Sequence, residues 1–170
     1  SARRLGDHAL GAVVGIHPHD AREASAAALS EIERLAGDPL VRAIGETGLD
    51  FHYQNSSRAE QVASLRAHVA IAHRAGKPLV IHCRDASADL EQVLLEERAH
   101  LPRGVVHCFT GTSGEARRML DLGFALSFSG IVTFKNAAGL REAARVVPRD
   151  GLLVETDAPF LAPVPLRGRR

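Results

Sequence analysis

The feature that most constrains the fold of this chain is the alternation of short apolar runs with segments of helical periodicity. The apolar runs are continuous, which is typical of strands that are buried on both faces of a parallel sheet. The expected strands span residues 9–16, 40–46, 78–83, 104–109, 124–129 and 151–156. The expected helices span residues 20–36, 57–76, 86–98, 112–123 and 137–146. This order predicts an α/β fold with parallel strands and right-handed crossovers.

Local capping signals set the expected starts and ends of the helices. Three pairs have capping-box spacing: Asp20 with Glu23, Ser57 with Glu60, and Thr112 with Glu115. Gly76 is placed to end the second helix in the left-handed conformation. The residues from Thr47 to Ser56 are expected to form a loop after the second strand.

Two architectures fit six parallel strands: an open doubly wound sheet and a (β/α)8 barrel. The chain contains no G-x-G-x-x-G or G-x-x-x-x-G-K-[ST] phosphate loop, which weakens the nucleotide-binding open-sheet interpretation. A barrel needs eight strands and typically about 250 residues, so two βα units are absent from the 170 residues. We expect a TIM-barrel-type parallel sheet that is incomplete here, with six strands that correspond to strands 3–8.

Composition limits the partners and the compartment. A net charge of +1 gives no overall attraction to nucleic acid or membrane, so an anionic substrate needs a local patch or a metal ion. Aromatic content is 4% and Trp is absent, which weighs against an extended base-stacking platform. No leader and no run of about 18 apolar residues is visible, so we expect neither secretion nor a membrane span. We expect Cys83 and Cys108 to be reduced thiols of a cytoplasmic protein.

Four residues with metal-ligating side chains stand at the ends of four expected strands. They are Glu46, His82, His107 and Asp157. Imidazole nitrogen and carboxylate oxygen are ligands for divalent metals, and the carboxyl ends of parallel strands converge on one face. A lone histidine is more often a core or surface residue, but the combination predicts a site for one or two ions. There Glu46 can bridge two ions, and Asp157 can hold metal and accept a proton from the attacking water.

Other polar residues near the strand ends allow two interpretations each. His17 and His19 flank Pro18 and either support the site or substrate, or lie in an exposed loop. Arg84 and Lys135 either meet a phosphate or lie on the surface. Asp50 either positions the loop of Glu46 or caps a turn.

The remaining histidines and the cysteines are given structural roles. We expect surface positions for the remaining histidines, which are His8, His52, His68, His73 and His100. Since successive strand side chains point to opposite sides, Cys83 and Cys108 are expected to pack against helices if His82 and His107 face the barrel interior. No G-x-S-x-G elbow occurs, which disfavours a serine hydrolase.

Five stretches together resemble the TatD family of metal-dependent deoxyribonucleases. They are residues 15–19 (GIHPH), 44–50 (IGETGLD), 81–84 (IHCR), 107–111 (HCFTG) and 155–159 (ETDAP). The resemblance implies a TIM-barrel hydrolase that uses one or two divalent ions, with magnesium, zinc and manganese as candidates. It implies Glu46, His82, His107 and Asp157 as ligands, with Asp157 as the base. The implied reaction is hydrolysis of DNA phosphodiesters, as a 3′-5′ exonuclease on single strands or 3′ ends.

The chain departs from the family pattern at both ends. The first two βα units, with a His-x-His pair that completes the metal site, and the C-terminal helix are absent, and Leu166 stands where relatives often carry His. We therefore expect residues 1–170 to form a single incomplete hydrolase domain, a monomer that alone binds metal weakly and is unstable or inactive. Two alternatives remain open: an amidohydrolase-like enzyme for a small ester, amide or lactone, and an inactive barrel fragment with a scaffold role.

Overall fold

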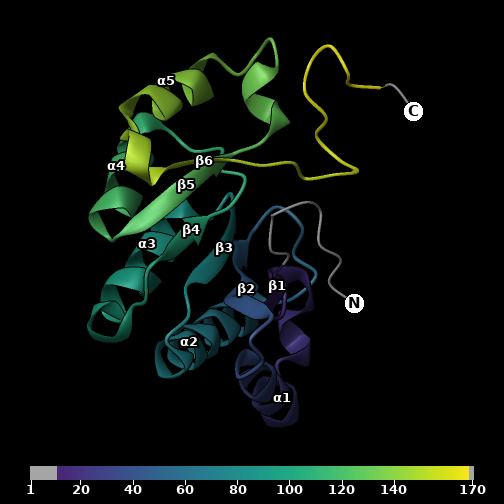
Figure 1. Ribbon diagram of the computed structural model, residues 1–170, viewed down its shortest axis with the longest axis vertical. Coiled ribbons are helices and arrows are strands. Elements are labelled where there is room, and N and C mark those ends of the chain that lie inside the picture. Colours follow the sequence, from purple (N-terminus) through teal and green to yellow (C-terminus); the bar gives the residue numbers. More distant parts are fainter. Residues whose placement is uncertain (1–10, 169–170) are drawn as a thin grey trace. The chain divides into compact units, whose positions relative to one another are not determined.

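The computed structural model describes residues 11–168, and the chain divides into two compact units with the boundary after Gly104 (Figure 1). Both units consist of strands that alternate with helices, and the strands follow chain order within each unit. The pairings β1–β2, β2–β3 and β5–β6 are parallel. The predicted α/β class with parallel strands is therefore confirmed.

The first unit carries three strands with β2 in the middle. Its elements are β1 (Ala12–Val14), the 3-10 helix η1 (Pro18–Glu23), α1 (Ala26–Ala36), β2 (Val41–Asp50), α2 (Arg58–Ala75), β3 (Leu79–Arg84), α3 (Ser87–Glu96) and the 3-10 helix η2 (Arg98–His100). Val14 pairs with Ile44, and Gly48 pairs with His82 on the other side of β2. Helix α2 packs on β2, and the fully buried side chains include Leu49 and Leu65.

The second unit begins within β4 and continues the alternation. Its elements are β4 (Gly104–Val106), α4 (Ser113–Asp121), β5 (Phe124–Phe128), the 3-10 helix η3 (Gly130–Thr133), α5 (Ala138–Val146), the 3-10 helix η4 (Arg149–Gly151) and β6 (Leu152–Val154). Leu126 of β5 pairs with Leu152 of β6. Phe124 and Leu126 are fully buried, and Met119 of α4 is buried in the same unit.

Two capping boxes and the end of α2 at Gly76 are confirmed, whereas the predicted start of the first helix is wrong. Ser57 and Thr112 each accept the expected backbone hydrogen bond, and Gly76 adopts φ 62° and ψ 32°. Asp20 does not cap a long helix, because residues 18–23 form a 3-10 helix that ends at Ala24 (ψ 54°). Ser25 caps α1 instead, with its hydroxyl accepting from the Ala28 N–H.

The second strand is longer than predicted, and the two outer strands are less buried. β2 continues through Asp50, because Thr47 to Asp50 pair with residues 81–84 of β3, so the expected loop is shorter. Burial on both faces holds in β2 but not in β6, where Val154 is 80% exposed, or in β1, where Val13 is exposed. In the first unit β1 pairs with β2, and in the second unit β6 pairs with β5.

None of the helices in residues 11–168 combines the length and hydropathy that a membrane span needs.

Candidate metal centre

Glycines let β2 and β3 approach closely where the candidate residues stand. A Cβ atom on Gly48, where φ is 140°, would lie 2.0 Å from the His82 carbonyl oxygen. A Cβ atom on Gly45, where φ is 146°, would lie 2.4 Å from the Val80 carbonyl oxygen. Gly45 and Gly48 thus let the two backbones lie close together, and Glu46 of β2 contacts His82 of β3.

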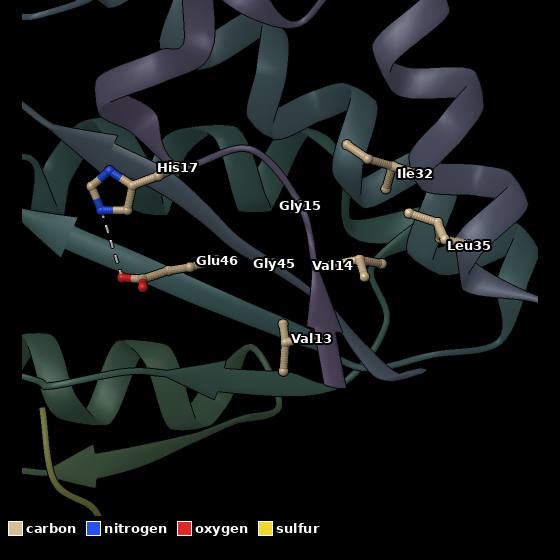
Figure 2. Close-up of a pocket in the computed structure, with 8 residues that line it drawn as sticks. All are labelled: Val13, Val14, Gly15, His17, Ile32, Leu35, Gly45 and Glu46. Atoms are coloured by element: carbon tan, nitrogen blue, oxygen red, sulfur yellow. Dashed lines mark ion pairs between the residues drawn. The ribbon is translucent and has the colours of Figure 1, made fainter. Parts of the chain in front are cut away.

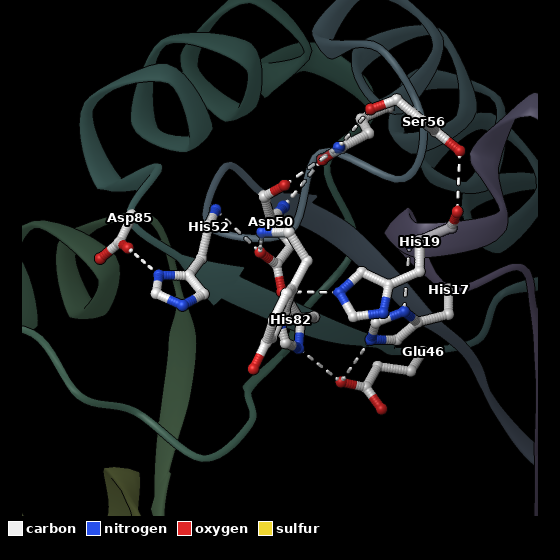
Figure 3. A network of polar contacts seen from close by, with 10 residues as sticks. His17, His19, Glu46, Asp50, His52, Ser56, His82 and Asp85 are labelled. Carbon is white, nitrogen blue, oxygen red and sulfur yellow. Dashed lines mark hydrogen bonds and ion pairs between the residues drawn. The ribbon is translucent and has the colours of Figure 1, made fainter.

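His82 lies between two carboxylates (Figure 3). Its Nδ1 is 3.0 Å from Glu46 Oε1, and its Nε2 is 3.0 Å from Asp50 Oδ2. Burial by itself lowers the pKa of His82, but the hydrogen bond and charge of Glu46 and then those of Asp50 outweigh it and raise the pKa. When the ring is protonated, both of its nitrogens can donate to these carboxylates.

Asp50 is the best-connected acid of the site, although the sequence left its role open. It is 1% exposed, and its Oδ1 accepts hydrogen bonds from the backbone N–H groups of His52 (2.9 Å) and Tyr53 (3.0 Å). Its Oδ2 lies 2.9 Å from His19 Nε2 as well as close to His82. Burial tends to raise the pKa of Asp50, but the hydrogen bonds from Tyr53, His19 and His82 prevail and lower it to about 2. Asp50 therefore both caps the turn after β2 and orients His82.

His17 completes a group of three donors with Glu46 and His82. Its Nε2 is 3.8 Å from Glu46 Oε1, and its ring centroid is 4.7 Å from that of His82. Its Nδ1 accepts from the His19 N–H at 3.2 Å, which in the neutral ring leaves the proton on Nε2. Burial lowers the pKa of His17, and the neighbouring His82 lowers it further.

The donor atoms of His17, Glu46 and His82 lie within 4.8 Å of one another, so the group can hold a metal ion. Two imidazole nitrogens and one carboxylate oxygen form a set that suits a divalent ion such as zinc. His17 and Glu46 stand at one end of a hollow of about 460 Å³, whose walls include Val13 and Ile32 (Figure 2). Metal binding requires neutral imidazole, so an ion would compete with the proton of His82.

A buried histidine of α2 fixes the segment that carries His17. His68 is fully buried, its Nε2 accepts from the Ile16 N–H at 3.0 Å, and its Nδ1 donates to the Ser64 carbonyl at 2.7 Å. The expected surface position of His68 is therefore wrong: the ring fills the core and satisfies the backbone beside His17. Burial lowers the pKa of His68, and the ring is in its neutral form because Nε2 accepts a hydrogen bond. His52, His73 and His100 are exposed as expected, and His8 lies outside the described residues.

His107 and Asp157 belong to the second unit, and their role as metal ligands stays a prediction. His107 follows β4 and its Nδ1 lies 2.5 Å from Glu155 Oε2. Glu155 Oε1 also accepts from the Cys108 N–H (2.5 Å) and from the Ser127 hydroxyl (2.6 Å). Asp157 is half-buried in the loop after β6, where its carbonyl accepts from the Phe160 N–H.

The two cysteines differ from each other in their surroundings, and so do the two basic residues that are candidates for phosphate binding. Cys83 Sγ is 3.9 Å from Ser87 Oγ of α3, as expected for a thiol that faces a helix. Cys108 is not in a strand and its φ is 44°, so the alternation argument is wrong there; its Sγ is 3.0 Å from Ser129 Oγ. The Arg84 guanidinium lies over the Tyr53 ring, whereas Lys135 is exposed after η3.

Sequence reasoning missed Glu155, placed His68 wrongly on the surface, and left the role of Asp50 open between two interpretations. Each of these residues contacts a residue that is distant in the sequence. Asp50 and His82, for example, are 32 positions apart. The one sequence signal for these two acids was their position in stretches that carry the family resemblance. Asp50 lies in residues 44–50, and Glu155 lies in residues 155–159.

The chain is similar in sequence to known proteins of one family. A family model described as "TatD related DNase" matches residues 2–170. The chain is 48% identical over 155 residues to the "Uncharacterized metal-dependent hydrolase YcfH" of Escherichia coli K12, covering 91% of this chain and 58% of that protein. It is 39% identical over 171 residues to the "3'-5' ssDNA/RNA exonuclease TatD" of Klebsiella pneumoniae, covering 99% of this chain and 65% of that protein.

Solved structures confirm the fold. The crystal structure of YJJV, a TatD homologue from E. coli K12, superposes with a TM-score of 0.86 at 28% identity and covers 94% of this chain and 62% of that one. The TatD family protein from Entamoeba histolytica gives a TM-score of 0.80 at 30% identity, covering 92% of this chain and 53% of that one. The chain thus spans 58–65% of the curated relatives named above.

Proposed function

Because this chain belongs to the family of TatD-related DNases, we propose that it is a divalent-metal-dependent hydrolase that cleaves phosphodiester bonds of single-stranded DNA from the 3′ end. The observation that carries the proposal is the convergence of His17, Glu46 and His82, whose donor atoms lie within 4.8 Å of one another. One relative is named for 3′-5′ exonuclease activity on single-stranded DNA and RNA, which supports both the substrate and the polarity.

The proposed chemistry assigns separate tasks to the residues of the first unit. A divalent ion, with magnesium, zinc or manganese as candidates, would supply Lewis-acid activation of water and of a phosphoryl oxygen when bound. Glu46 contributes the negative charge that attracts the cation, while His17 and His82 contribute neutral nitrogens. Asp50 holds His82 through Nε2, which leaves Nδ1 directed at Glu46. This arrangement is the carboxylate–histidine pairing that commonly orients metal ligands.

We also assign metal binding to His107 and Asp157, with Asp157 as the base that accepts the proton of the attacking water. The support is their sequence position after β4 and β6, which matches that of ligand residues at strand ends. In the second unit Glu155 contacts His107 as Asp50 contacts His82, through one ring nitrogen. Arg84 and Lys135 are assigned to the substrate phosphates, and the protein is assigned to the cytoplasm as a monomer.

The test is cleavage of a single-stranded oligodeoxynucleotide labelled at its 5′ end, with and without chelator. With a chain that also carries the first two βα units, we expect a ladder of products shortened from the 3′ end, which chelator abolishes and added Mg²⁺, Mn²⁺ or Zn²⁺ restores, whereas residues 1–170 alone are expected to be inactive. Glu46→Gln and His82→Ala should each lower the rate at least about a hundredfold, because each removes a donor. His73→Gln, an exposed histidine of α2, is the control. Cleavage that is resistant to chelator or unchanged by Glu46→Gln would contradict the proposal.

A further inference from the structure

We propose that Tyr53 and Arg84 form a subsite for one nucleotide of a single-stranded nucleic acid, with the base stacked on the tyrosine ring and a backbone phosphate on the guanidinium. The subsite rests on the proposed function, because the metal centre beside it would cleave the bound strand. Tyr53 is the one tyrosine of a chain without tryptophan, and it is 49% exposed in the turn that follows β2. An exposed ring next to a metal centre is a stacking surface that any base can use.

The Tyr53 ring contacts neighbouring side chains on several sides. Its backbone N–H donates to Asp50 Oδ1 at 3.0 Å. The ring makes edge-type contacts with His52, at a centroid distance of 4.7 Å, and with His19, at 5.5 Å. Since the same Asp50 carboxylate orients His82, the stacking surface and the metal centre share one support. A ring ordered in advance loses little conformational entropy when a base stacks on it.

Arg84 supplies the positive charge that a phosphate needs. Its guanidinium carbon lies 4.8 Å from the centre of the Tyr53 ring. No carboxylate lies within ion-pair distance of Arg84 among residues 11–168, whereas the adjacent Asp85 is paired with His52 at 3.0 Å. A guanidinium that stacks on a ring keeps its N–H edge for bidentate contact with phosphate.

The distance from Tyr53 to the metal centre suits neighbouring nucleotides of one strand. The ring centroids of Tyr53 and His19 are 5.5 Å apart, and those of His19 and His82 are 6.3 Å apart. Tyr53 is therefore no farther from His82 than these two distances together. A strand whose base stacks on Tyr53 can place an adjacent phosphate at the donors His82 and Glu46. The partner that fits this surface is a single strand, because a duplex hides the faces of its bases.

The test compares two fluorescein-labelled probes of equal length: oligothymidylate and an abasic phosphodiester oligomer. Binding is measured by fluorescence anisotropy at low salt with chelator present, so that no cleavage occurs. We expect oligothymidylate to bind more tightly than the abasic probe. Tyr53→Ala should weaken oligothymidylate binding about tenfold and leave the abasic probe unchanged, since stacking is the interaction lost. Tyr53→Phe keeps the ring and should bind as the original chain does.

The arginine is tested with the same probes and a matched control. Arg84→Gln should weaken binding of both probes to a similar extent, because it removes a phosphate contact. Arg42→Gln, an exposed arginine at the opposite end of β2, should change neither. In cleavage assays with Mg²⁺, Tyr53→Ala should raise KM about tenfold and change kcat less than twofold.

Two results would overturn the subsite: equal binding of the two probes by the unaltered chain, or a preference for bases that survives Tyr53→Ala. Binding that depends on Tyr53 in a protein that cleaves neither probe with any metal leaves the subsite in place and contradicts the proposed function alone.

Discussion

Asp50 is a buried carboxylate that contacts several groups of the candidate metal centre. Four donors converge on it, two backbone N–H groups and two imidazole nitrogens. An amide in its place would keep the volume but would direct N–H hydrogens at one pair of these donors. Such a conflict is costly in a buried position because the unmade hydrogen bonds cannot be replaced by water.

We expect Asp50→Asn to lower metal affinity about 10- to 100-fold, because the carboxylate that orients His82 and makes it a stronger ligand is lost. Competition against a chromophoric chelator for Zn²⁺ measures the change. Asp85→Asn, which alters an exposed acid paired with His52, is the matched control and should leave the affinity unchanged. Equal affinities for the Asp50→Asn and unaltered chains would show that His82 needs no such support.

Gly48 is the second residue on which the site depends. A Cβ atom there would meet the His82 carbonyl oxygen, and the φ of 140° is strained for any other residue. We expect Gly48→Ala to lower the free energy of unfolding by about 2 kcal/mol or more, because both strain and a clash arise. Urea unfolding followed by circular dichroism measures it. Gly139→Ala in α5, where a Cβ atom meets nothing within 4 Å, should be neutral or slightly stabilising. Similar losses in both variants would contradict this account of Gly48.

The sequence singled out Glu46 and His82 but did not settle the roles of the residues that support them, and in the structure both lie within strands, β2 and β3. Glu46 and His82 stand after apolar runs, and that position alone marks them. Asp50 was harder to place because its stretch was interpreted as a loop, whereas pairing with β3 extends the strand. Glu155 was overlooked beside Asp157, since nothing local shows that it contacts His107.

At the scale of elements, local signals predicted the structure well where a cap decides the boundary. Ser57, Thr112 and Gly76 mark helix ends through hydrogen bonds and backbone angles that depend on a few adjacent residues. The start of α1 was missed because His17 and Pro18 begin a 3-10 helix, whose hydrogen bonds leave Asp20 without a cap role. The burial of His68 on α2 was missed because it depends on Ile16, 52 residues away.

Helix α2 gives a prediction about pH through His68. The folded state lowers the pKa of His68 from 6.5, so below pH 6.5 the unfolded chain binds a proton that the folded chain does not. The free energy of unfolding therefore falls as the pH drops below 6.5, by at most about 1.4 kcal/mol per pH unit for this group. Stability from the raised pKa of His82 has the opposite sign, since it is lost as the pH rises, so only a comparison of variants isolates His68.

We expect His68→Gln to remove the part of the fall in the free energy of unfolding below pH 6.5 that His68 causes. Glutamine cannot titrate, but its side-chain oxygen can still accept a hydrogen bond from the Ile16 N–H. Urea unfolding at pH 7.5 and pH 5.5 with chelator present measures the difference between the variant and the unaltered chain. His73→Gln, on the exposed side of the same helix, should keep the original pH dependence. An unchanged difference between the two pH values in His68→Gln would contradict the role given to the buried ring.

At the scale of the whole molecule, the chain consists of two compact units, and each holds a histidine with a carboxylate partner. A metal ion that binds the folded state stabilises whatever holds it, and slows hydrogen exchange there. We expect Zn²⁺ to slow exchange in β2 and β3, next to Glu46 and His82. If His107 and Asp157 are ligands as proposed, exchange also slows in residues that flank β4 and β6.

Hydrogen exchange read by mass spectrometry, with Zn²⁺ and with chelator, separates these two predictions. His82→Ala should abolish the effect of Zn²⁺ on β2 and β3, and His73→Ala should not, because only the first removes a donor. Protection confined to residues 41–50 and 79–84 would mean that the first unit alone holds the ion, and that His107 and Asp157 are not ligands. Protection that extends into the second unit and is lost with His107→Ala supports all four residues, because the loss then follows from removal of a donor in the second unit.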